Sequence, residues 1–252
     1  AALEPDNPAL PILLGQALVD CGAGAEAVEL LRRAVALEPA APLPRSLLGK
    51  ALFLAGQWSE AERMFSALLE THPADRLALT FLGLCRYQRK DLAAAIDCFD
   101  RALVLKPDDA DVLINRGIAL MDSGRLEEAR DGFVAAMAQG GDPAAAFANL
   151  GVVAHRLKDI GGAIFAYRAA ERLNPDLPRL YSNLSTVLVE AAEPAAALAA
   201  ADQAVQRDPE DAAAQFNRAV SLLKLGRLRE GWLAYESVSY THLRAHETRM
   251  VI

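Results

Sequence analysis

The sequence contains few cysteines and no long apolar run. Its three cysteines, Cys21, Cys85 and Cys98, have no CxxC or metal-ligand spacing, which favours reduced thiols in a cytoplasm over a disulfide framework. The chain begins at Ala1 rather than at a methionine, so the sequence leaves open whether a signal peptide precedes it. No window of about 18 uncharged apolar residues occurs, which excludes a transmembrane helix. The sequence therefore predicts a soluble chain without a membrane partner.

The sequence also lacks an excess of positive charge and the usual signatures of an active site. Its 26 Lys and Arg residues are outnumbered by 33 Asp and Glu residues, for a net charge of -7. Nucleic-acid binding needs clustered Lys and Arg, so we expect no nucleic-acid partner. We find no Gly-rich phosphate loop, Ser-His-Asp set or pair of acidic catalytic residues. The sequence therefore predicts that this chain is not itself an enzyme and needs no cofactor or metal.

Proline recurs along the chain at intervals of 34 residues or twice that interval. The recurring prolines are Pro5, Pro39, Pro73, Pro107, Pro175 and Pro209. The one missing position is occupied by Gly141 after Gly140, and glycine ends helices as effectively as proline does, through a left-handed C-terminal turn. In this register the repeats are residues 8–41, 42–75, 76–109, 110–143, 144–177, 178–211 and a partial repeat, 212–236.

Each repeat places small and large residues at fixed positions. Position 8 is always small (Gly15, Gly49, Gly83, Gly117, Gly151, Ser185, Ala219), and so is position 20, which is alanine or glycine. Position 24 is large in six of the seven repeats (Leu31, Phe65, Phe99, Phe133, Tyr167, Tyr235), with Ala201 as the exception. Small residues allow two helices to cross closely. A glycine-marked turn near position 15 separates them, so the pattern predicts a helix, a turn and a second helix in every repeat.

These positions resemble the tetratricopeptide repeat over residues 1–236: small residues at 8 and 20, an aromatic residue at 24, alanine at 27 and proline at 32. The resemblance implies an all-α, right-handed superhelical solenoid. It also implies that the first helix of each repeat lines a concave groove, and that the protein binds peptides or partner proteins.

Position 6 of the first helix carries asparagine in four consecutive repeats. These residues are Asn115, Asn149, Asn183 and Asn217. Asparagine is a mediocre helix former, but its carboxamide can pair with any peptide group. We therefore predict a ladder of free carboxamides that holds an extended polypeptide, which resembles the asparagine ladder of O-linked N-acetylglucosamine transferases. The alternative is that each amide bonds a neighbouring repeat and only joins the two repeats together.

Charged residues of both signs accompany the asparagines on the predicted groove. Asp111 and Arg179 occupy position 2, and Asp122 and Arg156 occupy position 13. We predict that these four residues contribute to peptide binding, with Arg179 beside Asn183 as the best candidate for an acidic group.

The two ends of the sequence look truncated. Residues 237–252 have no repeat pattern and resemble a translated sequencing adapter at the end of an environmental reading frame, so we expect a non-native tail. The preceding residues Gly231, Trp232, Tyr235 and Glu236 resemble a junction in bacterial repeat proteins that leads into a glycosyltransferase-like domain. Three functions stay open: a scaffold that binds extended polypeptide, the recognition arm of a truncated glycosyltransferase, and a solenoid that is structural or dimerises. The sequence leaves the oligomeric state undetermined.

Overall fold

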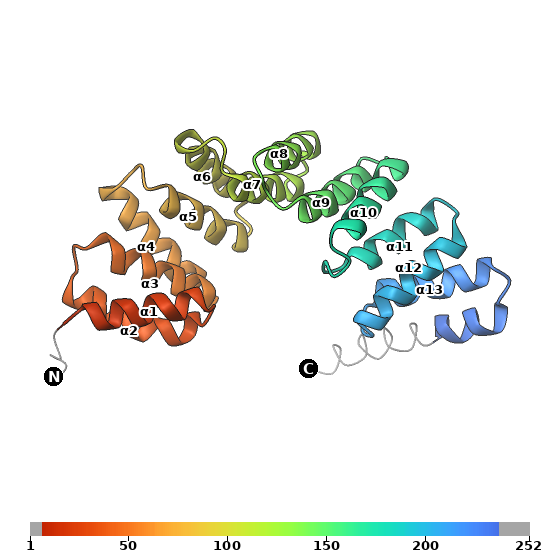
Figure 1. Cartoon of the computed structure of the whole chain (residues 1–252), viewed down its shortest axis with the longest axis horizontal. Helices are drawn as coiled ribbons and strands as arrows, with labels where there is room; N and C mark the ends of the chain where they lie inside the picture. Colours follow the sequence, from red (N-terminus) through yellow and green to blue (C-terminus); the bar gives the residue numbers. More distant parts are fainter. Residues whose placement is uncertain (1–6, 237–252) are drawn as a thin grey trace. The chain divides into compact units, whose positions relative to one another are not determined.

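The computed structural model describes residues 7–236, which are helical apart from short turns and contain no strand (Figure 1). The prediction of an all-α chain of helix-turn-helix repeats is confirmed. The chain divides into two compact units, unit 1 up to Gln139 and unit 2 from Gly140. The predicted adapter tail, residues 237–252, lies outside the described residues. No helix among residues 7–236 is long and apolar enough to cross a membrane.

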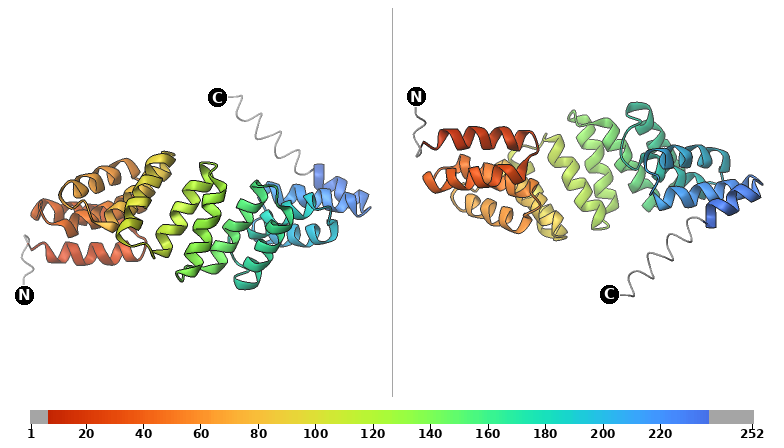
Figure 2. Two further views of the ribbon diagram at one scale, coloured as in Figure 1. Left: turned by 90° about the horizontal axis from the view of Figure 1, so that it is seen from above. Right: turned by 90° about the horizontal axis from the view of Figure 1, so that it is seen from below.

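Unit 1 contains four repeats, each a hairpin of two helices joined by a short turn (Figure 2). Its helices are α1 (Ala9–Asp20), α2 (Gly24–Leu37), α3 (Pro42–Leu54), α4 (Trp58–Thr71), α5 (Arg76–Gln88), α6 (Leu92–Leu105), α7 (Ala110–Asp122) and α8 (Leu126–Ala138).

Unit 2 contains the remaining three repeats. Its helices are α9 (Pro143–Arg156), α10 (Ile160–Leu173), α11 (Leu180–Glu190), α12 (Pro194–Arg207) and α13 (Ala212–Lys224), followed by a helical segment at residues 228–236. The first helix of every repeat begins within two residues of the position that the 34-residue period predicts.

The turn inside each repeat depends on one residue with a left-handed backbone. Gly22, Gly56, Gly124 and Gly226 have φ between 74° and 85°, a conformation that glycine adopts without steric cost. The N–H of the next residue then donates to a carbonyl five residues earlier, as Ala23 does to Leu18 at 2.8 Å. The other three repeats place Lys90, Lys158 and Ala192 in the same conformation, where a side chain is strained.

Position 8 is small because the residue at position 24 lies directly against it. A Cβ added to Gly151 would lie 2.6 Å from the ring of Tyr167, and Gly49 and Gly83 have the same relation to Phe65 and Phe99. Such distances are far inside ordinary carbon contact. The rings are fully buried, so this glycine-to-ring contact forms the centre of each repeat.

Neighbouring repeats are joined by ion pairs at the two positions where arginine interrupts a run of leucine. Arg116 Nε donates to Asp100 at 2.5 Å, and Arg218 Nε donates to Asp202 at 2.6 Å. In both pairs the arginine is at position 7 of one repeat and the aspartate is at position 25 of the repeat before it. The second helix of one repeat therefore packs on the first helix of the next.

Within each unit, the first helices of neighbouring repeats lie closer together than the second helices do. In unit 1, α1 contacts α3, α3 contacts α5 and α5 contacts α7; in unit 2, α9 contacts α11 and α11 contacts α13. Among the described helices of either unit, no second helix contacts the second helix of the adjacent repeat. Each unit therefore curves towards its first helices, and we refer to their exposed surface as the first-helix face.

Candidate polypeptide-binding face

Three of the four asparagines present carboxamides without a hydrogen-bond partner. Asn115 lies on α7 of unit 1, and Asn149 and Asn183 lie on the adjacent helices α9 and α11 of unit 2. All three are half-buried. Within the described part of the chain, none of their side chains makes a hydrogen bond. Each amide can therefore offer a donor and an acceptor to a bound chain.

The prediction of a free carboxamide is wrong for Asn217. Its side chain on α13 is buried, and Nδ2 donates to Ser185 Oγ and to Thr186 Oγ1, both at 2.9 Å. Ser185 in turn donates to the carbonyl of Ser182 at 2.8 Å. Both N–H groups of Asn217 are therefore used between repeats, and this residue joins α13 to α11.

The residues of the preceding repeat explain why Asn217 differs. An asparagine at position 6 faces positions 8 and 9 of the repeat before it, as Asn217 faces Ser185 and Thr186. For Asn183 the same two positions are Gly151 and Val152, which carry no polar side chain. A hydroxyl group at these positions therefore determines whether the asparagine amide makes a hydrogen bond within the chain.

Unit 1 has apolar residues in the same column. Leu47 is buried, and the ring of Phe81 stacks on Phe65 at 5.5 Å and packs edge-on against Phe53 at 5.8 Å. Lys50 Nζ lies 5.5 Å from the centre of the Phe81 ring. The first-helix face of unit 1 therefore begins with aromatic and aliphatic groups and becomes polar at Asn115.

The two predicted charged residues of unit 1 lie at opposite ends of one helix. Asp111 is exposed in the first turn of α7, whereas Asp122 is the last residue of that helix and accepts a hydrogen bond from Tyr87 at 2.7 Å. Arg156 is the exposed last residue of α9. These side chains lie at the ends of the first helices, so they border the asparagine column.

Arg179 was expected on the first turn of its helix, and this expectation is wrong. The residue has φ 59° and precedes α11, which begins at Leu180. Four other first helices begin after an aspartate whose side chain caps a backbone N–H, as Asp211 caps Ala214. Leu177 stands before α11 at the register position where α5, α7 and α13 have their capping aspartate, so no side chain caps the first turn of α11.

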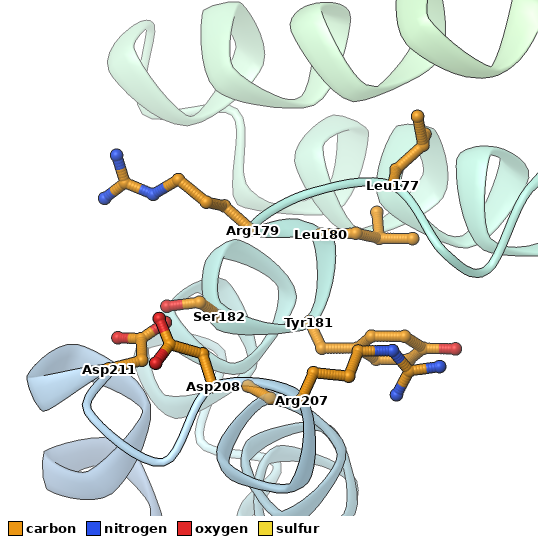
Figure 3. A pocket seen from close by; sticks show the side chains of 9 residues that line it. Leu177, Arg179, Leu180, Tyr181, Ser182, Arg207, Asp208 and Asp211 are labelled. Atoms are coloured by element: carbon orange, nitrogen blue, oxygen red, sulfur yellow. The ribbon is translucent and has the colours of Figure 1, made fainter.

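Arg179 borders a small cavity of about 60 Å³ (Figure 3). Arg207 lies over the ring of Tyr181 at 4.4 Å on one side, and Arg179 extends away from this pair on the other. Asp208 and Asp211 add two carboxylates to the lining. Burial raises the pKa of Tyr181. A cavity of this size and mixed charge holds only a few atoms.

The sequence reasoning missed a line of polar contacts at the C-terminal ends of the first helices of unit 2. His155 Nε2 lies 2.9 Å from Glu190 Oε1 on the next first helix. Lys224 Nζ donates to the carbonyl of Val189 at 3.3 Å. Each contact joins residues 35 apart, so a search for charge pairs one repeat apart could have found the first of them. These contacts fix the helix ends that flank the asparagines.

Solved structures with this arrangement of helices support the fold assignment. The chain is similar to a structure of the APC/C hetero-tetramer Cut9–Hcn1, with a TM-score of 0.76 and 17% identity, over 87% of this chain and 44% of that one. It is similar to PilW, a type IV pilus biogenesis factor, with a TM-score of 0.73 and 19% identity, over 83% and 97% of the two chains. YrrB, described as a TPR protein with an unusual peptide-binding site, matches with a TM-score of 0.59 and 20% identity, over 74% and 98%.

Sequence comparisons identify the family. The protein FlbA of Caulobacter vibrioides is 43% identical over 82 residues, which is 31% of this chain and 14% of FlbA. The chain thus spans only a small part of that relative's length. The tetratricopeptide repeat family matches residues 46–110, 114–178 and 183–238, which together are most of the chain. From these matches and the seven repeats described above, the chain belongs to the tetratricopeptide repeat family.

Proposed function

We propose that this chain is a protein-interaction scaffold that holds an extended polypeptide on its first-helix face. Asn149 and Asn183 bind the backbone of the polypeptide in unit 2, and Asn115 offers the same group in unit 1. Asp111, Asp122, Arg156 and Arg179 border this face and influence which side chains are accepted.

The observation that carries the proposal is the contrast between Asn183 and Asn217. Both residues occupy position 6, but only Asn217 meets hydroxyl groups in the preceding repeat. A purely structural asparagine would need such a partner, because an amide that bonds only water gains nothing over alanine in a helix. Gly151 and Val152 leave Asn183 without one.

The spacing of the asparagines suits an extended chain. Packed helices lie about 8 to 10 Å apart, and an extended chain advances about 3.3 Å per residue. One carboxamide therefore meets about every third residue of the bound polypeptide. Because the contact is to backbone, peptides of unrelated sequence should bind. The fold of YrrB, which is described as having a peptide-binding site, agrees with such a use of the repeat surface.

The test compares binding and stability in matched variants. Linear peptides are first selected on the wild-type chain from a random library, and three unrelated binders are measured by fluorescence anisotropy. Asn183→Ala should weaken all three by about 2- to 13-fold, the range for one lost hydrogen bond of 0.5 to 1.5 kcal/mol. Asn217→Ala should instead lower the unfolding midpoint, because it leaves Ser185 and Thr186 without their donor, and should change binding little.

A second variant keeps the amide of Asn183 but gives it a hydrogen-bond partner within the chain. Val152→Thr places a hydroxyl where Thr186 lies relative to Asn217, so it should occupy Asn183 and weaken the same three peptides. Unchanged peptide binding in both Asn183→Ala and Val152→Thr would reject the proposal. It would also be rejected if no linear peptide from the library bound the wild-type chain.

The alternative function is that of a recognition arm in a longer glycosyltransferase. It rests on the junction-like residues Gly231, Trp232, Tyr235 and Glu236. The ring of Trp232 stacks on Tyr235 at 6.0 Å, and its Nε1 donates to Glu236 at 3.0 Å, so these residues form an ordered group with exposed rings. Sequencing the genomic DNA beyond the codon for Glu236 tests this alternative: a glycosyltransferase domain in frame would support it, and any other continuation would remove it.

A further inference from the structure

Ser182 on α11 has a buried hydroxyl group without a hydrogen-bond partner. Five polar residues are buried in the described part of the chain: Asp109, Ser182, Ser185, Asn217 and Ser221. The side chains of four of them bond to another group of the chain, whereas Ser182, which is 4% exposed, makes no such bond. Buried polar groups are normally satisfied, so this exception calls for a partner that the chain itself does not supply.

The side chain of Ser182 lines the cavity of about 60 Å³ beside the start of α11 (Figure 3). Its hydroxyl points toward the carboxylates of Asp208 and Asp211, which line the same cavity. Arg179 and Asp208 are exposed at its edge, so a group from solvent can enter. One water needs roughly 10 to 15 Å³ of such space. The cavity therefore admits a larger group of a few heavy atoms.

The two carboxylates of this cavity have no cation against them. Asp208 accepts the backbone N–H of Glu210, and Asp211 accepts that of Ala214, with one oxygen each. Neither carboxylate forms an ion pair with a lysine or arginine among residues 7–236. Each therefore keeps a second oxygen for a further donor.

The arginines that line the cavity are directed elsewhere. Arg207 lies over the ring of Tyr181 at 4.4 Å and pairs with Asp176 at 3.6 Å. Arg179 extends away from the two cavity carboxylates (Figure 3). An anion that entered would be repelled by both carboxylates. The cavity therefore suits a cation that carries several hydrogen-bond donors.

The third repeat shows how such a carboxylate binds a guanidinium group. Asp109 occupies the register position of Asp211. One of its oxygens caps the backbone N–H of Val112, and the other accepts a hydrogen bond from Arg76. Arg76 is the first residue of its repeat, where the sixth repeat has Pro178. Asp211 thus caps its helix as Asp109 does, but its own repeat supplies no guanidinium.

We propose that the cavity at Ser182 is a guanidinium site, which takes an arginine side chain of the polypeptide on the first-helix face. The five N–H groups of a guanidinium suffice for the two carboxylates and the hydroxyl. Ser182 directly precedes Asn183 in α11, so a polypeptide held by Asn183 passes beside the cavity. The source of the arginine rests on the proposed polypeptide-binding function, to which the site adds a preference for one basic residue.

The first test uses the arginine side chain alone, so it does not depend on polypeptide binding. N-acetylarginine amide is titrated at millimolar concentration into the full-length chain, and backbone amide signals are followed by NMR. We expect saturable shifts at Ser182 and Ala214. N-acetylcitrulline amide has nearly the same shape without the charge, so it should bind about tenfold more weakly.

Matched variants locate the bound cation. Asp211→Asn removes one negative charge from the cavity but retains a helix cap, because asparagine caps as well as aspartate does. It should weaken binding of the arginine compound by about tenfold. Glu210→Gln removes one negative charge from the same loop outside the cavity lining, so it should change binding little.

The second test uses the three peptides selected on the wild-type chain. Each arginine of a peptide is replaced in turn by citrulline, and binding is measured by fluorescence anisotropy. In each peptide, one replacement should weaken binding to the wild-type chain by about tenfold. The same replacement should have little effect on binding to Asp211→Asn, because the charge that it meets is already absent.

Four results would overturn the guanidinium site. The absence of a saturable shift at Ser182 would show that the cavity holds only water, and shifts seen only in Arg179→Ala would show that Arg179 fills it. Equal weakening by Asp211→Asn and Glu210→Gln would reduce the effect to the general charge of the loop. Equal losses from citrulline in wild type and Asp211→Asn would place the peptide arginine elsewhere. A chain that binds the arginine compound but no peptide would instead reject the polypeptide-binding function and support the guanidinium site.

Discussion

The contact between Gly151 and Tyr167 can be tested by enlarging the residue at position 151 and shortening the side chain at position 167. The sixth repeat already has the exchanged residue sizes, because position 8 is Ser185, position 24 is Ala201, and both are fully buried. We therefore predict that Gly151→Ser and Tyr167→Ala each destabilise the protein, and that the double variant is much less unstable than the sum of the two.

The structure sets the size of each effect. The added Cβ at Gly151 would lie 2.6 Å from Tyr167 Cε1, about 1 Å inside ordinary carbon contact, and the ring is 1% exposed. Overpacking of this kind costs about 1 to 3 kcal/mol, and truncating a buried aromatic residue costs about 3 to 5 kcal/mol. In the double variant the serine enters space that the ring has left, so we expect a coupling of about 1 to 3 kcal/mol.

Urea unfolding followed by circular dichroism, fitted with a nearest-neighbour description of the repeats, measures these differences. Gly124→Ser is the control. No atom lies within 4 Å of a Cβ at that position, and its φ is +85°, so its effect is backbone strain of about 1 kcal/mol and Tyr167→Ala should not relieve it. Additive effects of Gly151→Ser and Tyr167→Ala, within about 0.5 kcal/mol, would refute the steric argument.

The other two predictions concern the turn residues and the thiols. Ala192→Gly should stabilise the protein by about 0.5 to 1 kcal/mol, because Ala192 has φ 59° where four other repeats have glycine. The reverse change Gly226→Ala should destabilise it in the same urea assay, and a loss of stability in Ala192→Gly would contradict the backbone strain at Ala192. Burial raises the pKa of the Cys85 thiol to about 12, and Cys98 is buried too, so at pH 8 iodoacetamide should label the exposed Cys21 alone until urea unfolds the chain. Labelling of Cys85 in the folded protein, detected by mass spectrometry, would contradict this prediction, because it would show that the helices around Cys85 open without urea.

The 34-residue period predicted the helices because both helices and turns depend on local residues. Small and large residues alternate at fixed positions, and a left-handed turn residue follows each first helix, so one register locates nearly every element. The register failed at Arg179, where Leu177 replaces a capping aspartate and the first turn of α11 changes. The division into two units near Gly140 is not visible in a regular period either.

The partners of the asparagines needed information from across a repeat boundary. The sequence shows Asn217 in the same column as the other three, but its bonds depend on which positions of the preceding repeat it faces. Once that relation is known, Ser185 and Thr186 are readable in the sequence. The pairing of Arg116 and Arg218 with aspartates sixteen residues earlier follows the same rule. Long-range contacts in a solenoid are thus regular, but one solved interface is needed to learn them.

The polar contacts of Asn217 and Arg218 couple the opening of the seventh repeat to that of the sixth. In a solenoid, the stability of a repeat depends on its coupling to its neighbours. The seventh repeat is tied to the sixth by the bonds of Asn217 and by the pair of Arg218 with Asp202. Opening of α13 therefore requires the buried hydrogen bond between Asn217 and Ser185 to break. The amide hydrogens of the helices that carry Asn183 and Asn217 should consequently exchange with solvent together.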